Sequence, residues 1–305
     1  MEKIIELTDV NKSYDKKHKA LENMNLNIYE NDIFGLVGSN GAGKSTILKL
    51  LSGAILKDSG HISILGNSDD DLIKSFSKMG FLIENPLFYD ELSGMNNLIY
   101  LCKLRGMKID NALEIAKEFG IYKHLSKKVK SYSTGMRQRL GLVAAFMAKP
   151  KIILLDEPIN GLDPEGITFL RNYLLKINKS WQSTIIISSH ILNELSLIAT
   201  RYAFIKDGKL IEEISKEEFE DKSKQFISIE LEKEDLEKAA ALLEMKFNVK
   251  DYKVYPDGEL RIYENFNTKD LQKFLVENAI FLKSIKVKEK SLEEYYLEKV
   301  GENND

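Results

Sequence analysis

Residues 33–51 of the chain read IFGLVGSNGAGKSTILKLL. The opening IFGLV is a short apolar run typical of a buried parallel strand, and the closing TILKLL has the spacing of a helix. Between them, Gly38–Ser45 fits the pattern G-x-x-x-x-G-K-[ST], in the strand, loop and helix setting that this pattern requires. An incidental glycine-rich turn is the weaker interpretation. The stretch predicts an α/β fold with a phosphate-binding loop at the end of a strand.

Each residue type in this loop has a chemical reason. Glycines let the backbone fold so that successive N–H groups face phosphate oxygens. Lys44 places a positive charge on the β and γ phosphates, and the Ser45 hydroxyl offers a hard oxygen to Mg²⁺. We therefore expect ATP and Mg²⁺ as cofactors. The residues of this stretch expected to contact the nucleotide are Gly38, Ser39, Asn40, Gly41, Ala42, Gly43, Lys44, Ser45 and Thr46.

A second strand, KIILLDEP (151–158), ends in two adjacent acids. At the carboxyl edge of a parallel sheet the chain can turn both acids toward the crevice where α/β folds bind ligands. Asp156 then suits the magnesium shell, and Glu157 suits a general base that polarises the attacking water. The alternative is a solvated acidic strand end before Pro158. A third strand, TIIISSH (184–190), completes the expected core.

The stretch YSTGMRQRLG (132–141) raises a different question, because it also has the form of an anion site. A Ser and a Gly stand where a helix should begin, and a helix start leaves backbone N–H groups free to hold an anion. One domain would then have two phosphate sites. An ordinary N-cap explains Ser133, but it does not explain the neighbouring Thr-Gly and the basic RQR.

Composition limits the classes of function. With 44 Lys plus Arg against 47 Asp plus Glu and a net charge of −3, nothing favours a nucleic-acid partner. The single cysteine, Cys102, cannot form an internal disulfide and is expected to be a small buried hydrophobe. The start MEKIIELTDV lacks the basic and apolar pattern of a secretion signal. No apolar run approaches the roughly 20 residues of a membrane span.

The chain divides into a large α/β part and a smaller tail. Residues 86–148 have more helical spacing and predict a helical subdomain inserted into the core. A hairpin with an Asp-Gly turn is expected at 204–214, followed by a charged linker at 215–224. Residues 225–305 then predict the order β-α-β-β-α-β of a ferredoxin-like α+β unit.

With its motifs at 38–45, 132–139 and 156–158, the sequence resembles the ATP-binding subunit of ABC transporters over roughly residues 4–214. The resemblance implies a P-loop NTPase cassette at 1–214. YSTGMRQR is similar to the family's Leu-Ser-Gly-Gly-Gln signature, with Ser133 and Gly135 kept and Met136 in place of Gln. In the family two subunits pack head to tail, so these three residues are expected at the nucleotide held by a second subunit, an identical chain.

The remaining family motifs follow in order. Asn160-Gly-Leu-Asp163 resembles the D-loop that crosses the dimer interface, and Asp163 is expected near the shared nucleotide. His190 resembles the switch histidine that touches the γ-phosphate, where an imidazole can donate a hydrogen bond. Tyr14 matches the aromatic residue that stacks on adenine, although any exposed Tyr in a hairpin would look the same.

One position departs from the family. Where the family has Gln on the loop after the second core strand, this chain has Glu84, and its four glutamines all lie outside the loop. A carboxylate binds Mg²⁺ as readily as an amide, but it adds negative charge beside the triphosphate. Glu84 is therefore expected to be a metal ligand, and the site is expected to be functional with altered coupling to the membrane partner or altered metal dependence. Together with YSTGM and the tail, it resembles the bacitracin-resistance and lantibiotic-immunity branch of the family.

The resemblance implies an ATPase subunit that powers export of a peptide antibiotic or similar amphiphile through a separate membrane subunit. Such a subunit is cytoplasmic and peripheral on the inner face of the membrane. Its helical subdomain is expected to dock on the permease through Pro86, Leu87, Phe88 and Tyr89, whose alternative role is core packing. The competing hypothesis is a soluble or regulatory ABC-type ATPase without a transport role.

Overall fold

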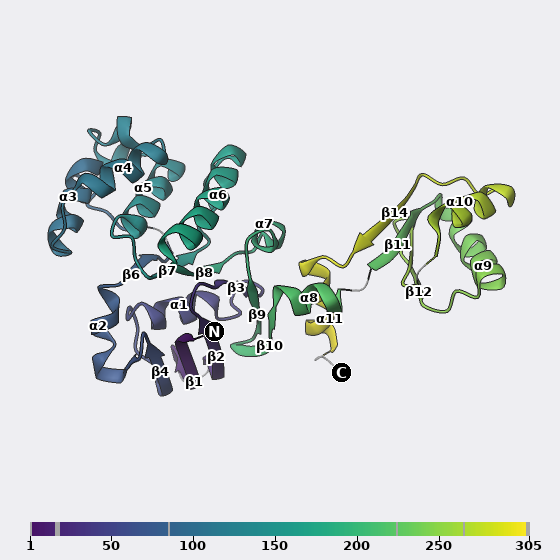
Figure 1. Cartoon of the computed structure of the whole chain (residues 1–305), viewed down its shortest axis with the longest axis horizontal. Coiled ribbons are helices and arrows are strands. Elements are labelled where there is room, and N and C mark those ends of the chain that lie inside the picture. The colour runs from purple at the N-terminus through teal and green to yellow at the C-terminus, as the bar shows by residue number, and fades with distance from the viewer. Residues whose placement is uncertain (1, 16–18, 85, 224, 265, 303–305) are drawn as a thin grey trace. The chain divides into compact units, whose positions relative to one another are not determined.

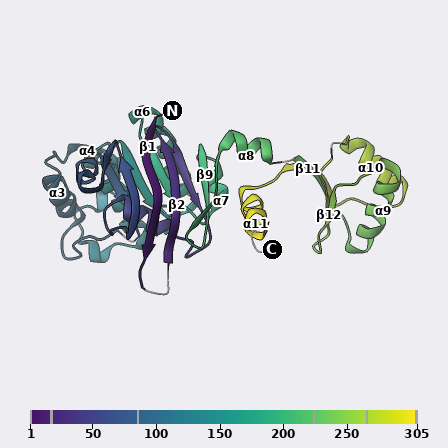
Figure 2. The same cartoon turned by 90° about the horizontal axis from the view of Figure 1, so that it is seen from below.

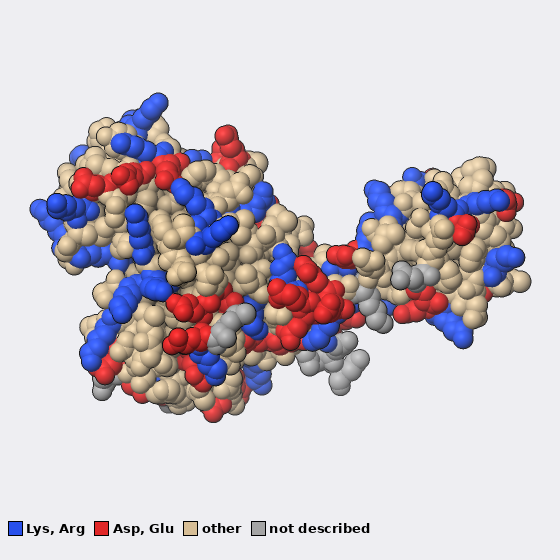
Figure 3. All heavy atoms as spheres, viewed as in Figure 1, with Lys and Arg blue, Asp and Glu red and all other residues tan. Residues whose placement is uncertain are grey.

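The structure is a computed structural model of the whole chain, and it describes residues 2–15, 19–84, 86–223, 225–264 and 266–302. The chain forms two compact units: the first comprises Met1–Lys216 with Lys299–Asp305, and the second comprises Glu217–Glu298 (Figure 1). Each unit has a hydrophobic core of its own. On the face drawn in Figure 3, cationic and anionic side chains are interspersed.

A six-stranded sheet crosses the first unit in the order β10-β9-β3-β8-β7-β6. All neighbours are parallel except β9 and β10. Every residue of β3, β7 and β8 is buried, as expected for Ile- and Leu-rich parallel strands covered on both faces, and the three expected core strands are confirmed. The strands are β3 Ile33–Val37, β6 Met79–Leu82, β7 Ile152–Asp156, β8 Thr184–Ser188, β9 Arg201–Lys206 and β10 Lys209–Ser215.

The register of this sheet brings three strand ends to one edge. Leu36 of β3 pairs with Ser188 of β8, and Ser188 pairs in turn with Asp156 of β7. The segments that follow these strands therefore start side by side, which is where open α/β sheets bind ligands. The hairpin expected at 204–214 is confirmed. It consists of β9 and the edge strand β10, joined at Asp207-Gly208.

A second sheet is antiparallel, in the order β2-β1-β4-β5 (Figure 2). Its strands are β1 Lys3–Ser13, β2 Lys19–Tyr29, β4 Ser59–Ile64 and β5 Asn67–Ser68. Helix α1, Lys44–Leu51, shares one hydrophobic core with residues of both sheets. The sequence pattern did not predict these strands, because β1 and β2 pair with several register shifts and their apolar alternation is interrupted.

The remaining helices of the first unit form the expected helical segment and its surroundings. In the range 86–148 lie α3 Gly94–Leu104, α4 Asp110–Glu118 and α5 Thr134–Phe146, with short 3₁₀ turns at Tyr122–His124 and Val129–Ser131. Cys102 of α3 is buried, as expected. Elsewhere are η1 Asp69–Asp71, α2 Ile73–Phe76, α6 Pro164–Trp181 and α7 Leu192–Ser196. Across the described ranges of the chain, no helix is long and apolar enough to cross a membrane.

The second unit has a four-stranded antiparallel sheet in the order β12-β13-β11-β14. Helices α9 and α10 pack on one face around Ile229, Leu243 and Leu275. The succession strand, helix, strand, strand, helix, strand matches the expected ferredoxin-like order. The elements are β11 Gln225–Glu230, η4 Lys233–Asp235, α9 Leu236–Phe247, β12 Tyr252–Val254, β13 Glu259–Ile262, α10 Thr268–Glu277, β14 Ser284–Glu289 and most of α11 Leu292–Glu302.

The stretch 215–224, expected to be a charged linker, is not an irregular connection. It contains helix α8, Lys216–Lys222. Lys and Glu are good helix formers, and the one apolar side chain in the stretch, Phe219, is buried and packs edge-on against Tyr295 at 5.3 Å. The charged composition therefore marked the exposed side of a short helix. The compact second unit begins at Glu217 and includes most of this helix.

Candidate nucleotide-binding site

The loop between β3 and α1 has the backbone that a phosphate cradle needs. Gly41 and Gly43 have φ values of 83° and 112°, which glycine adopts without strain. A Cβ on Gly43 would lie 2.8 Å from a methyl carbon of Leu21 and 2.9 Å from the carbonyl oxygen of Ala20. Gly43 is also the N-cap of α1 and offers no side-chain cap. The first N–H groups of α1 are therefore available to an anion.

Lys44 is folded back into the loop that precedes it. Its Nζ donates to the carbonyl oxygens of Gly38 at 2.6 Å and Ser39 at 3.0 Å, and the residue is buried. Burial lowers the pKa of Lys44, and attraction to Glu157 and Asp156 opposes that shift. Among the described residues Lys44 forms no ion pair with a carboxylate. The cation is held in the cradle by neutral acceptors, which a phosphate can replace.

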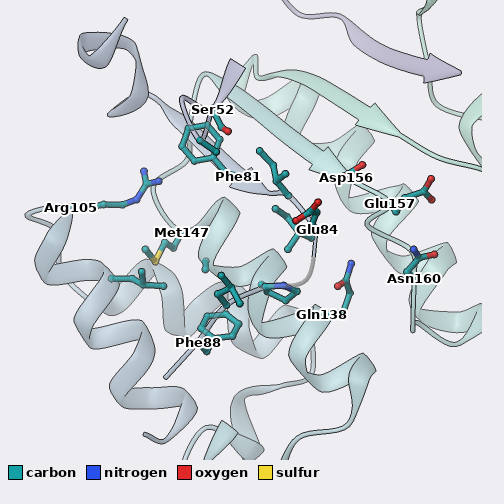
Figure 4. A pocket seen from close by; sticks show the side chains of 18 residues that line it. Ser52, Phe81, Glu84, Phe88, Arg105, Gln138, Met147, Asp156, Glu157 and Asn160 are labelled. Carbon is teal, nitrogen blue, oxygen red and sulfur yellow. The ribbon is translucent and has the colours of Figure 1, made fainter. Parts of the chain in front are cut away.

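The two acids at the end of β7 take different surroundings. Asp156 is buried and accepts a hydrogen bond from Ser188 Oγ at 2.5 Å. The N–H of Glu157 donates to the same Ser188 hydroxyl at 3.0 Å. Glu157 has a φ of 46°, a left-handed conformation that is strained for a residue with a side chain and is held here by these contacts. Figure 4 shows both acids at the end of the strand, on the same side of the sheet.

His190 holds the carboxylate of Glu157. Its Nδ1 lies 2.6 Å from Glu157 Oε2, and its backbone N–H donates to the same oxygen at 3.2 Å. The Glu157 side chain is 21 % exposed and that of His190 is 50 % exposed. The pair therefore sits at the surface with the acid oriented and still reachable by water.

The donor set suits a divalent ion. Ser45 directly follows Lys44, and Asp156 lies at the adjoining strand end, so a hydroxyl and a carboxylate flank the loop. In the described parts of the chain, no group of three or more His, Cys, Asp or Glu could hold a metal by itself. Mg²⁺ in phosphate sites typically takes one or two protein ligands and completes its shell with phosphate oxygens and water. The residues present fit that arrangement.

Tyr14 lies beside the helix that follows the loop. Its hydroxyl is 3.4 Å from Thr46 Oγ1, and 55 % of the residue is exposed. Thr46 itself is buried. The aromatic ring is thus tethered near the start of α1 while its surface stays open to a flat ligand.

Glu84 is not free in the described structure. It follows β6 with a φ of 56°, and its carboxylate forms an ion pair with Lys49 of α1. The sequence pattern indicated Glu84 as a candidate site residue but did not indicate Lys49. A cation five residues beyond the P-loop lysine, TILKLL, was the only signal available for it.

The signature segment starts a helix, as expected. Ser133 is the N-cap of α5, and its Oγ accepts from Met136 N at 3.3 Å. Tyr132, which stands at the family's Leu position, is buried and donates its hydroxyl proton to the carbonyl of His124 at 2.8 Å. Gly135 approaches the D-loop so closely that a Cβ would lie 2.7 Å from the carbonyl oxygen of Gly161. The contacts of Ser133 and Gly135 among described residues lead to the D-loop and their own helix, not to the P-loop.

Asp163 has a structural task of its own. It is the N-cap of α6, accepts from Gly166 N at 3.2 Å and forms an ion pair with Arg139 at 2.9 Å. Gln138 adds a second link, because its Nε2 donates to the carbonyl of Pro158 at 2.8 Å. These contacts give Asp163 a structural role that needs no nucleotide. Together with the Gln138 bond, they connect α5 to the segment after Glu157. Sequence reasoning did not identify Gln138 and Arg139 as that link.

A cleft of about 1000 Å³ opens beside this site, between the core sheet and the helical segment (Figure 4). Glu84, Asp156 and Glu157 line one part of it, and Arg105 lines another. Leu87 at its rim is 95 % exposed. The apolar lining includes Phe81, Pro86, Leu87, Phe88, Leu101 and Met147.

Comparison with known proteins agrees with this geometry. Residues 21–160 match the family model described as ABC transporter. The chain is 36% identical over 304 residues to the bacitracin transport ATP-binding protein BcrA of Bacillus licheniformis, covering 99% of this chain and 98% of that protein. It is 38% identical over 208 residues to the lantibiotic transport ATP-binding protein SrtF of Streptococcus pyogenes, covering 68% of this chain and 89% of that protein.

Two solved structures are similar to the first unit. The ATP-binding subunit of an ABC transporter superposes with a TM-score of 0.66 at 25% identity, covering 72% of this chain and 92% of that one. A dimeric ATP-binding cassette in a post-hydrolysis state, bound to ADP and phosphate, superposes with a TM-score of 0.63 at 27% identity, covering 70% of this chain and 98% of that one.

Proposed function

This chain belongs to the family of ABC transporter ATP-binding subunits, which bind and hydrolyse ATP, and we propose that it powers export of a peptide antibiotic or similar amphiphile. The observation that carries the proposal is the reach of the similarity to the bacitracin transport subunit. It covers 304 residues and therefore includes the second unit, whereas the family model ends at residue 160. In the proposal, residues 1–214 are the cassette and residues 225–305 are an accessory domain.

The hydrolytic step is assigned to Glu157 and His190. Glu157 accepts a proton from a water whose oxygen forms a bond to the γ-phosphorus. The bond between that phosphorus and the bridging oxygen breaks, and ADP leaves with the electron pair. Because His190 Nδ1 faces Glu157 at 2.6 Å, the imidazole would meet the γ-phosphate through Nε2.

Nucleotide binding is assigned to the loop and its neighbours. The N–H groups at the start of α1 and Lys44 would hold the β and γ phosphates, and Tyr14 would stack on adenine. Ser45 and Asp156 would hold Mg²⁺, which neutralises charge on the phosphates when bound. Glu84, also expected as a metal ligand, lines the same cleft and is held by Lys49.

We place a second copy of the chain across the nucleotide. Ser133, Gly135 and Met136 lie at the start of α5, where the positive end of the helix can meet an anion. A partner's nucleotide would meet this end, with Asp163 at the same interface. The similar solved cassette is dimeric, which supports this arrangement.

The membrane partner would occupy the cleft. Its apolar lining and the exposed Leu87 and Tyr89 suit a short amphipathic segment of a permease on the inner face of the membrane. Phe88 and Glu84 both line the cleft, so a segment seated there would reach the loop that carries Glu84 (Figure 4). This links the partner to the nucleotide site.

A susceptibility assay tests the proposed cargo. The chain is expressed in a sensitive Gram-positive host together with the membrane subunit that copurifies with it. We expect the minimal inhibitory concentration of bacitracin or of a lantibiotic to rise, and Glu157→Gln to abolish the rise. Unchanged susceptibility to every peptide antibiotic, with ATP turnover by the purified complex intact, would contradict the assignment of cargo.

A further inference from the structure

Glu84 brings a charge to a place that is already negative. Asp156 and Glu157 line the same cleft, and a bound triphosphate adds several further negative charges. The residue has a left-handed backbone, with a φ of 56°, directly after β6. Something must offset its carboxylate if ATP is to bind with ordinary affinity.

Lys49 is placed to do so. It lies five residues beyond Lys44 on α1, about 7.5 Å along the helix axis. Its ammonium contacts the Glu84 carboxylate, and its side chain is 24 % exposed. Lys49 therefore brings a positive charge to Glu84 beside the nucleotide site.

We propose that Lys49 is the charge partner of Glu84: a positioning residue that holds this carboxylate after β6 and cancels its effect on bound ATP. The proposal rests on the nucleotide site described above. It explains how the chain carries Glu at this loop without repelling its own substrate. It also makes Lys49 and Glu84 one functional unit: changing either residue alone should alter nucleotide affinity, and changing both should not.

Fold stability is a poor explanation for this pair. Partly exposed ion pairs contribute little to folding, typically below about 1 kcal/mol. A ligand with several negative charges responds more strongly to each nearby unit charge, because the Coulomb energy scales with the product of the charges. The pair should therefore be visible in nucleotide affinity and nearly invisible in thermal stability.

The test is a titration of the full chain with an ATP analogue carrying a fluorescent group on its ribose, first in EDTA and then in excess Mg²⁺. Lys49→Gln should weaken binding on the order of 5-fold, and Glu84→Gln should strengthen it by a similar factor. The double variant should return to the wild-type affinity. Lys49→Arg keeps the charge and should bind like wild type. The two single effects should shrink together in high salt.

Lys57 and Asp69 provide a matched control. They form an ion pair at 3.2 Å with side chains 26 % and 49 % exposed, close to the 24 % and 59 % of Lys49 and Glu84. Lys57→Gln should leave affinity for the analogue unchanged. If Lys49→Gln behaved like Lys57→Gln, or if Glu84→Gln did not restore the affinity lost with Lys49, the proposal would be wrong.

Failure of the site assignment would look different. Lys44→Ala should abolish binding of the analogue in every background. If Lys44→Ala bound the analogue as well as wild type, the P-loop assignment itself would be overturned. If Lys44→Ala abolished binding but the Lys49 and Glu84 variants did not show the expected changes in affinity, the P-loop assignment would stand and the charge-partner proposal would be wrong.

Discussion

At the scale of single residues, the contact between Glu157 and His190 gives the sharpest chemical statement. Glu157 has a strained backbone conformation. Its N–H donates to the Ser188 hydroxyl, and its carboxylate contacts His190 Nδ1. Such strain persists only where surrounding contacts enforce it, and it commonly marks a functional position. The sequence already suggested both roles, but not that the two side chains touch.

Replacing the acid should separate binding from hydrolysis. Glu157→Gln keeps the size of the side chain and removes the proton acceptor, so we expect phosphate release to fall by about 10²- to 10⁴-fold while nucleotide affinity is retained. Phosphate release by purified protein and titration with the fluorescent analogue measure the two quantities. A turnover rate close to wild type would remove Glu157 from its assigned role.

Several residue roles were predictable because the motif itself states the chemistry. Gly41, Gly43 and Lys44 follow from the loop pattern, and Asp156 with Glu157 follows from a strand that ends in two acids. Lys49, Gln138 and Arg139 were not predictable. Their partners, Glu84, Pro158 and Asp163, lie 20 to 35 positions away in the sequence, and no local pattern announces such contacts.

At the scale of elements, strand β13 of the second unit carries a largely buried ionic network. Arg261 pairs with Glu259 and Glu294, and its guanidinium lies over the rings of Phe226 at 4.7 Å and Tyr255 at 4.4 Å. Its side chain is 17 % exposed. Breaking one member of such a network leaves an unpaired buried charge.

We therefore expect Arg261→Met to destabilise the second unit by about 3 kcal/mol. Hydrogen exchange of peptides covering β11 and β13 measures the effect locally. The control is Lys273→Ala, which removes an exposed pair with Glu277 at 3.9 Å and should change protection by less than about 0.5 kcal/mol. Equal effects of the two variants would contradict the importance of the network.

The same network predicts an acid dependence. Burial alone would raise the pKa of Glu259, but hydrogen bonds from Ser228, Arg261 and Lys288 outweigh burial and lower it. The pKa of Glu294 is also lowered, by Ser291 and Arg261 against burial. Because both carboxylates have lower pKa values in the folded state, their stabilisation is present above the ordinary value of 4.5 and is lost as the pH falls through the folded values.

Exchange protection of β11 and β13, corrected for intrinsic rates, should therefore drop as the pH falls below about 4.5, and Arg261→Met should flatten this dependence. If exchange protection of β11 and β13 rose as the pH fell, the lowered pKa values of Glu259 and Glu294 would not explain the acid dependence.

The cleft beside the helical segment gives a prediction about partners. Phe88 lines the cleft, and the exposed Tyr89 packs edge-on against Tyr100 at 5.3 Å. We expect the double variant Phe88→Ala, Tyr89→Ala to lose copurification with the membrane subunit while still binding ATP. Tyr122→Ala, another exposed aromatic residue of the helical segment that does not line the cleft, is the matched control and should copurify normally. Normal recovery of the membrane subunit with the double variant would exclude this docking surface.

At this scale the sequence predicted the buried strands well and the boundary elements poorly. Apolar runs such as IILL and TIII are typical of buried parallel strands, so β7 and β8 followed directly. In contrast, β1 and β2 are interrupted by register shifts, and KEEFEDK was taken for a linker because six of its seven residues are charged. One buried Phe219 makes that stretch a helix, and local composition does not show burial.

At the scale of the whole molecule, the two segments proposed to bind phosphate, the P-loop and the start of α5, make separate contacts among the described residues. Ser133 and Gly135 contact their own helix and the D-loop, while the P-loop closes on Lys44. Gln138 and Arg139 tie the start of α5 to the segment that follows Glu157. If a partner's nucleotide binds at Ser133, those two contacts can transmit the resulting shift of α5 to the segment that follows this chain's own Glu157.

The central claim is that two identical chains share each nucleotide, and sedimentation of Glu157→Gln tests it most directly. Removing the base should trap the closed state, so the variant should sediment as a monomer without nucleotide and as a dimer with Mg-ATP. Ser133→Arg in the same background should stay monomeric, because its bulk and charge block the partner's phosphate. If Glu157→Gln remained monomeric with ATP bound, two copies of this chain would not form the shared site.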